Sequence, residues 1–193
     1  MTTGTDEPAL VCVTGRFQPV HQDHLALFQA ALAAGGRLIV AVTNPDPGAR
    51  RQEPASEHRH RAHANPFTFL ERLELLVSAL GAEEELGRDG AAQVRIVPFD
   101  LTRPEHWSHY VPLTAVQYVG VHGPWEQDKA DRLAAAGYRV VQVPGHHPQP
   151  RRSSTAIRAA MRTGPDWEQL VPAATVPTLR VLLARRTAAG SLL

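Results

Sequence analysis

The sequence contains a single cysteine, Cys12, so an internal disulfide is excluded and no cysteine pair exists that could hold a structural metal ion. Cys12 lies inside an apolar run, and we therefore expect a small core residue there rather than a nucleophile or a ligand. Redox chemistry is not expected of this chain.

Long hydrophobic runs are also lacking. No apolar stretch is long enough to span a bilayer, and the opening residues MTTGTDE carry neither the basic nor the apolar region of a signal peptide. We therefore expect a cytoplasmic protein without a membrane partner. The chain has 193 residues, of which 43% are hydrophobic, which is enough to bury one good core. We predict a single domain over residues 1–193, with its core between about residues 9 and 186 and flexible termini.

Lysine is scarce as well, because Lys129 is the only one and the other nineteen of the twenty basic residues are arginines. The net charge is only +1 and the arginines are spread among nineteen acidic residues, so a nucleic-acid partner is not expected. Guanidinium groups bind phosphate oxygens in a planar, bidentate way, so individual arginines can matter more than their total.

The chain does contain a regular alternation of short apolar runs and amphipathic segments. Five runs are typical of buried strands: residues 10–14, 37–42, 94–98, 117–121 and 139–143. Each is followed by helix-like sequence, and this alternation favours parallel strands. We predict an α/β fold, a doubly wound Rossmann-like parallel sheet of about five strands with helices on both faces.

The segments between these runs give the expected helices and loops. The first helix ends at Gly35 and Gly36, and later helices are expected over residues 128–136, from the Ser153 region to about 162, and over 172–186. The stripe of a further helix, closed by Gly81, consists of Leu70, Leu73, Leu76, Val77 and Leu80. Residues 87–92 and 144–150 are expected loops, and the long Pro-, Arg- and His-rich loop 43–65 is expected to be functional.

The most informative segment is GRFQPVHQDH at residues 15–24, directly after the first predicted strand. Gly15 breaks the strand, and His21 and His24 lie three residues apart at the start of a helix. A helix start has unpaired backbone N–H groups and the positive end of the helix dipole, so this arrangement suits a polyphosphate.

Two spaced motifs resemble the nucleotidylyltransferase superfamily. Residues 15–24 are similar to its GRFQPxHxGH segment, and SSTAIR at residues 153–158 is similar to its ISxTxIR segment. The subfamily most resembled is the archaeal-type nicotinamide mononucleotide (NMN) adenylyltransferases, because residues 65–72 match NPFTxxER and Trp107 matches an aromatic after the third strand. The tail at 167–172 also fits, so the similarity runs from about residue 11 to residue 182.

The resemblance implies transfer of AMP from ATP to the 5′-phosphate of NMN, which gives NAD and pyrophosphate, with Mg²⁺ carried by the nucleotide. It implies catalytic roles for His21, His24 and Arg158, with Arg16 and Arg158 holding the β and γ phosphates. The other triphosphate-binding residues that it implies are Gly15, Phe17, Gln18, Ser153, Ser154 and Thr155. It assigns Asn65, Pro66 and Phe67 to the acceptor pocket and places Trp107 against the pyridine ring.

Departures from the family pattern gather around the nucleotide. The glycine of HxGH is Asp23 here, and its carboxylate would repel polyphosphate, help to hold Mg²⁺ or cap its own helix. The basic residue expected before NPFT is Ala64, whose place Arg59, Arg61 or His63 could take. The short loop after the second strand is replaced by residues 43–52, and the SGN or TGN after the fourth strand becomes residues 121–124, including His122.

Each assignment has a plainer alternative. A histidine pair at this spacing is often surface decoration, Ser153–Thr155 are good helix caps in their own right, and Trp107 and Tyr110 could be ordinary core or lid aromatics. Zinc is a weaker interpretation because the pair lacks clear further ligands. The remaining histidines considered for that role are His58, His60, His63, His146 and His147.

Three functions therefore stay open. The first is an NMN adenylyltransferase, and the second is a relative that uses another triphosphate such as CTP, or another phosphate or phosphonate acceptor. The third is a nucleotide- or NAD-binding regulator without turnover. Retention of Arg16, His21, His24 and Arg158 favours the enzymes. A homo-oligomer is possible, but no sequence stripe assigns an interface.

Overall fold

The computed structural model describes residues 9–34, 36–52, 59–82, 94–144 and 153–190. Gly35, His58, the 87–92 connection, nearly all of the 144–150 loop and the His146–His147 pair, which the sequence analysis considered, lie outside the described residues. Within the described ranges, no helix is both long and apolar enough to cross a membrane.

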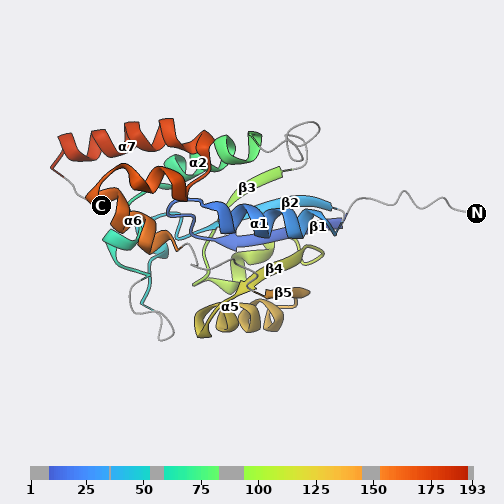
Figure 1. The fold of residues 1–193 in the computed structure, drawn as a ribbon. Coiled ribbons are helices and arrows are strands. Elements are labelled where there is room, and N and C mark those ends of the chain that lie inside the picture. The colour runs from blue at the N-terminus through green and yellow to red at the C-terminus, as the bar shows by residue number, and fades with distance from the viewer. Residues whose placement is uncertain (1–8, 35, 53–58, 83–93, 145–152, 191–193) are drawn as a thin grey trace, which may run out of the picture.

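Five parallel strands form one sheet in the order β3-β2-β1-β4-β5 (Figure 1). The strands are β1 (Ala9–Gly15), β2 (Gly36–Thr43), β3 (Val94–Phe99), β4 (Val116–Val121) and β5 (Val140–Pro144). Each end lies within one residue of the apolar run that predicted it. The predicted fold class is confirmed, with strand order reversing between β1 and β4.

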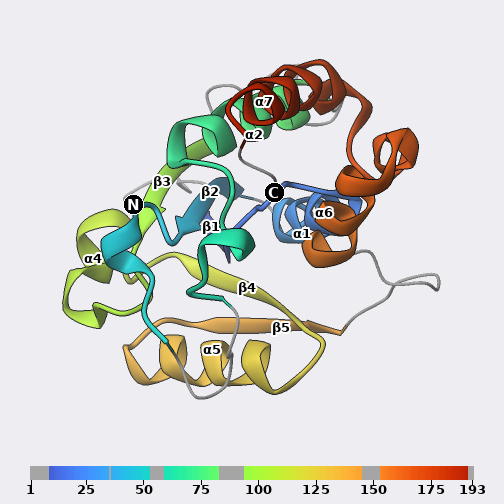
Figure 2. The ribbon, with the colours of Figure 1, turned by 90° about the vertical axis from the view of Figure 1, so that its left-hand side faces the viewer.

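Helices cover both faces of the sheet, as Figure 2 shows. One face packs against α1 (Gln22–Leu32), α2 (Phe69–Gly81), α6 (Ser154–Thr163) and α7 (Val176–Ala188). The other packs against α4 (Trp107–Tyr110) and α5 (Pro124–Ala135). Alternation along β1 separates the two cores, because Val11 and Val13 enter the first whereas Cys12 enters the second. The predicted core role of Cys12 is confirmed, and burial raises its pKa to about 12.

Short 3-10 helices connect these elements. They are η1 (Pro47–Ala49), η2 (Ala62–Ala64), η4 (Pro104–His106), η5 (Pro165–Leu170) and η6 (Ala173–Thr175).

Local signals explain most helix ends. Thr68 and Glu71 form a reciprocal capping box at the start of α2, and the Ser153 hydroxyl accepts the N–H of Ala156 at the start of α6, as predicted. α5 begins at Pro124, earlier than predicted, because proline suits the first turn of a helix. Gly137, at φ +92°, follows the end of α5.

The stripe predicted for α2 was partly wrong. Leu70 and Val77 are 61% and 57% exposed, whereas Arg72, Leu75 and Ala79 are buried. The buried face is displaced because Arg72 turns inward to bond backbone carbonyl groups at the ends of β1 and β2, which hydrophobic spacing alone does not reveal.

Candidate active site

A cleft of about 460 Å³ opens at the carboxyl ends of β1 and β4, which is a size typical of ligand sites. Its walls come from the β1–α1 turn, the α1 helix, the β4–α5 segment, the end of β5 and the start of α6. Segments far apart in sequence therefore meet where an α/β sheet with reversed strand order binds ligands.

His21 and His24 lie together at the N-terminus of α1 and both line the cleft. Their ring centroids are 3.7 Å apart, and the backbone N–H of His21 donates to Nδ1 of His24 over 3.2 Å. Because Nδ1 accepts this bond, the proton of neutral His24 lies on Nε2. The Phe17 ring packs edge-on against His24 with 4.9 Å between centroids and fixes its orientation.

The turn after β1 depends on Gly15 and Phe17. A Cβ on Gly15 would lie 2.8 Å from the Phe17 ring, and Phe17 itself has φ +50°. Gln18 is fully buried and clamps the turn to Phe67, whose N–H donates to its side-chain oxygen and whose carbonyl accepts from its amide, both at 2.9 Å. Gly15 and Phe17 line the cleft as expected, whereas Gln18 supports the turn from beneath rather than facing a triphosphate.

The two predicted phosphate motifs meet at this turn. Ser153, Ser154 and Thr155 line the cleft, and the Ser154 hydroxyl donates to the carbonyl of Pro19 over 3.2 Å. Arg158 is 4% exposed and lies just behind them, with Nη1 donating to the carbonyl of Gln18 over 2.8 Å and Nη2 to Oγ1 of Thr155 over 3.2 Å. Its guanidinium does not line the cleft, so in this structure Arg158 holds Thr155 in place.

Arg16 lines the cleft, unlike Arg158. Nη1 of Arg16 donates to the carbonyl of Ala64 over 3.1 Å. Ala64, where the family pattern has a basic residue, thus holds the side chain of Arg16 in place through its backbone carbonyl. Burial and the neighbouring Arg59, Arg158 and Arg72 lower the pKa of Arg16 to about 9. A pKa lowered by burial and by other cations indicates a place where an anion is electrostatically welcome.

The expected role of Trp107 is corrected by its position. The side chain is 2% exposed, its Nε1 donates to the carbonyl of Asp100 over 2.7 Å, and its ring packs near Phe99 and Tyr138 in the second core. Trp107 is therefore the core aromatic of the plainer alternative, with no ring face open for a ligand. Tyr110 is 45% exposed.

The other residues assigned to the acceptor pocket make hydrogen bonds or packing contacts within the protein. Asn65 donates to the carbonyls of Arg59 and Arg61 over 2.7 and 2.9 Å, and so shapes the loop that carries Arg59. The carbonyl of Pro66 accepts from Arg186, whose guanidinium also lies over the fully buried Phe67 ring. These residues support the site and do not line it.

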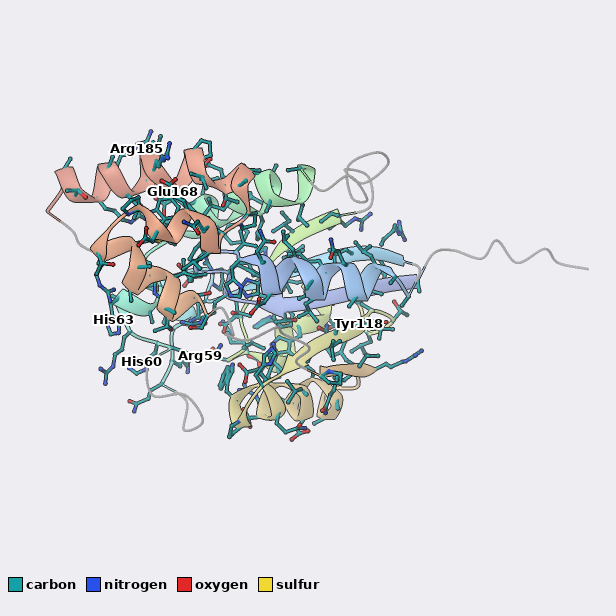
Figure 3. All side chains as sticks on the ribbon, in the orientation of Figure 1. Arg59, His60, His63, Tyr118, Glu168 and Arg185 are labelled. Carbon is teal, nitrogen blue, oxygen red and sulfur yellow. The ribbon has the colours of Figure 1, made fainter. Side chains whose placement is uncertain are left out.

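The three uncertain candidates separate in the structure. Asp23 and His122 line the cleft, whereas Arg61 has an exposed side chain that does not. In Figure 3, Arg59 lies on the side toward α5, and His60 and His63 lie farther out on the loop. Among the described residues, no group of three His, Cys, Asp or Glu side chains is placed to hold a metal ion.

Sequence reasoning named Arg59, on the loop between β2 and α2, as a possible phosphate ligand, but it missed Trp125, Glu126 and Lys129 on α5, which lie with Arg59 at the cleft. Nη2 of Arg59 lies 3.3 Å from Oε1 of Glu126, and its guanidinium lies over the Trp125 ring at 4.6 Å. Nζ of Lys129 donates to the carbonyl of Thr14 over 3.0 Å. All four side chains line the cleft. The isolated lysine was the signal available in the sequence.

A small recess adjoins the cleft at the ends of β2 and β3. Its volume is about 20 Å³, and it shares Arg16, Arg59 and Trp125 with the cleft. The rest of its lining includes Arg51, Thr43, Asn44 and Thr102. Three arginines, Arg16, Arg51 and Arg59, therefore converge on this narrow space.

Comparisons with known proteins agree with this geometry. The family model described as cytidylyltransferase-like matches residues 12–160. Phosphonoformate cytidylyltransferase of Streptomyces viridochromogenes is 34% identical over 168 residues, which cover 87% of this chain and 89% of that protein. Nicotinamide-nucleotide adenylyltransferase of Saccharolobus solfataricus is 29% identical over 160 residues, which cover 82% of each.

A solved structure has the same fold. The bifunctional NMN adenylyltransferase/ADP ribose pyrophosphatase of Francisella tularensis superposes with a TM-score of 0.59 at 16% identity, over 84% of this chain and 45% of that longer one. At this identity the likeness concerns the fold alone.

Proposed function

Because the chain belongs to the cytidylyltransferase-like family, we propose that it transfers a nucleotidyl group from a nucleoside triphosphate to a small acceptor that carries a phosphate or phosphonate. The resemblance to nucleotidylyltransferases and the expectation of an enzyme of this class are confirmed by the family match and the named relatives. The observation that carries the proposal is the meeting of Arg16, His21, His24 and Thr155 in one cleft.

The reaction needs no covalent enzyme intermediate. An acceptor oxygen forms a bond to the α-phosphorus, the bond to the bridging oxygen of the β-phosphate breaks, and pyrophosphate leaves with the electron pair. Catalysis then consists of holding the acceptor in line and stabilising charge on the leaving pyrophosphate. Nε2 of His24 donates toward that charge, and Arg16 with the N-terminus of α6 binds the terminal phosphates. Arg158 acts as a positioning residue through Thr155.

Mg²⁺ fits this site as an ion carried by the nucleotide. Asp23 places a carboxylate in the first turn of α1, in the same cleft as the histidine pair. Magnesium in proteins is typically bound by one or two carboxylates together with substrate phosphates, so Asp23 would hold it. The bound ion would neutralise charge on the polyphosphate.

The acceptor is the finer part of the proposal. The sequence motifs alone rank NMN first, but Trp107 is closed within the core. The recess beside the cleft has room for about one water and holds no acceptor by itself. Arg16 and Arg59, which line both the recess and the cleft, suit an acceptor in the cleft that carries more than one negative charge. The relative at 34% identity, named for phosphonoformate and a cytidylyl group, supports CTP and a small phosphonate. ATP with NMN is the second candidate, supported by the relatives at 29% identity.

The test is a matrix of triphosphates and acceptors with Mg²⁺. Pyrophosphate release is measured with CTP or ATP against phosphonoformate, phosphonoacetate and NMN, and products are identified by mass. Turnover with CTP and a small phosphonate supports the first candidate, and NAD formed from ATP and NMN supports the second. If nucleotide binds in calorimetry but no pair releases pyrophosphate, the chain is the nucleotide-binding regulator and the proposal is wrong.

A further inference from the structure

Lys129 occupies the crevice at which the strand order reverses. Its Nζ donates to the carbonyl of Thr14, the residue before the Gly15 turn, and it shares the cleft with Thr14 of β1 and Gly120 of β4, the strands on either side of the reversal. The same side chain lines the cleft that holds the histidine pair. The bond to Thr14 uses one of the three N–H bonds of the ammonium group, which leaves two that can be donated to a ligand.

The surroundings of Lys129 are cationic on balance. Burial and Arg59 lower its pKa to about 8, although Glu126 and Cys12 act in the opposite direction. The carboxylate of Glu126 is shared with Arg59 at 3.3 Å. The other titratable groups that line the same cleft are Arg16, His21, Asp23, His24 and His122. An anion placed among these groups would offset the repulsion between Lys129 and Arg59.

Lys129 lines the cleft but not the small recess beside it. Arg16, Arg59 and Trp125 line both the cleft and the recess, so these side chains mark the junction between the two. Lys129 follows Trp125 by four residues on α5, so both project from one side of that helix, and both line the cleft. Lys129 therefore lies in the cleft beside the side chains that join it to the recess, where its ammonium group is placed to meet a phosphate bound next to the histidine pair.

We propose that Lys129 is a further cation of the reaction centre, whose ammonium group binds the non-bridging oxygens of the α-phosphate while the acceptor attacks. This inference rests on the proposed nucleotidyl transfer. The ammonium stabilises negative charge that builds on these oxygens as the new P–O bond forms and the bond to pyrophosphate breaks. The rival role is structural, in which Lys129 only ties α5 to the end of β1.

Chemical labelling tests the position of Lys129 without requiring turnover. Pyridoxal 5′-phosphate forms an imine with a free amine and releases water, and borohydride reduces the imine to a stable amine. Because Lys129 is the only lysine, the labelled side chain is identified unambiguously by peptide mass. At pH 8, Mg²⁺ and CTP or ATP at about ten times its dissociation constant should slow this labelling about tenfold. An equal rate with and without nucleotide overturns the inference.

Kinetics separate the catalytic from the structural role. Replacing the ammonium by a neutral chain, Lys129→Met, should lower kcat about 100-fold or more. Lys129→Arg should retain part of the rate, and the alkaline limb of its kcat/KM profile should move from near pH 8 toward pH 9, where Arg16 is the next cation. Asp131→Asn changes an exposed charge on the same helix and is the matched control.

Each outcome has a distinct meaning. A structural role predicts that activity in Lys129→Met falls only with the folded fraction and that the alkaline limb does not move in Lys129→Arg, and either result overturns the inference. Nucleotide protection without pyrophosphate release from any pair counts against the proposed function. Pyrophosphate release with unprotected labelling counts against Lys129 alone.

Discussion

Replacing Arg72 should greatly lower the free energy of unfolding, because its buried guanidinium group joins three separate segments. It is 1% exposed and donates from Nη1 to the carbonyls of Arg16 and Thr43 over 2.9 and 2.7 Å, and from Nη2 to the carbonyl of Asn44 over 2.8 Å. Its Nε also donates to Thr68 on its own helix over 3.2 Å. The turn after β1 and the end of β2 are thereby joined to α2.

The magnitude follows from these bonds. Each hydrogen bond to a charged group contributes about 1.5–3 kcal/mol net, and a neutral replacement leaves buried carbonyl groups without a donor. Taking the lower figure for the three bonds that link different segments, Arg72→Met should lower the free energy of unfolding by about 3–5 kcal/mol. For a chain of this size that corresponds to a fall in Tm of roughly 6–20 °C.

The assay is urea unfolding followed by far-UV circular dichroism, with pyrophosphate release measured on the folded fraction. Since the freed carbonyls belong to Arg16 and to the wall of the recess, kcat/KM for the acceptor should also fall beyond the loss of folded protein. Arg180→Met is the control, because Arg180 has a bidentate pair with Glu168 at the surface, where solvent screens it. An unfolding free energy for Arg72→Met within about 1 kcal/mol of the unchanged protein would refute the reasoning.

Three further changes test the site and its supports. His24→Ala should lower kcat by about two to four powers of ten if His24 stabilises the charge on the leaving pyrophosphate, as proposed, and an unchanged rate would remove His24 from the site. Asp23→Gly should weaken the Mg²⁺ dependence of turnover if the carboxylate holds the ion, whereas tighter nucleotide binding with full turnover would mean that it only repels phosphate. Burial acts to raise the pKa of Glu71, but its bonds with Arg186 and Thr68 hold that pKa below the usual value. The stabilisation by the Glu71 carboxylate is therefore complete above the unfolded pKa and disappears as the pH falls through the lower folded pKa. Glu71→Gln should therefore flatten the acid side of the stability curve in thermal unfolding between pH 3 and pH 6, and an unaltered curve would contradict this role.

The strands and the nucleotide turn could be read from sequence because they depend on short-range patterns. Apolar runs such as residues 37–42 are buried on both faces of a parallel sheet, so composition and length identify them. Gly15 could be identified because a glycine directly follows the apolar run of β1, and the structure gives the reason, since a Cβ there would meet the Phe17 ring. Ser153 could be identified because helix capping is local.

The distinction between lining and supporting residues could not be read in the same way. Gln18 and Arg158 stand in the expected motifs, but their hydrogen bonds go to the backbone of Phe67 and Gln18 across 49 and 140 residues of chain. A motif shows which residue type occupies a position. It does not show whether that side chain contacts the ligand or supports other residues that contact it. The prediction that Trp107 stacks on a ligand was wrong for the same reason. Its ring is enclosed by Phe99 and Tyr138, and this packing is visible only in the structure.

The walls of the site depend less on backbone hydrogen bonds than its base does. The base is held by backbone carbonyl groups that accept from Arg72 and Arg158, so a change there disturbs several segments together. The recess is lined by side chains such as Arg51 and Thr102 that project from the segments after β2 and β3. Substituting these alters which acceptor fits while the histidine pair and the β1 turn stay in place. Acceptor choice should therefore respond to changes at Arg51 that leave the triphosphate affinity unaltered.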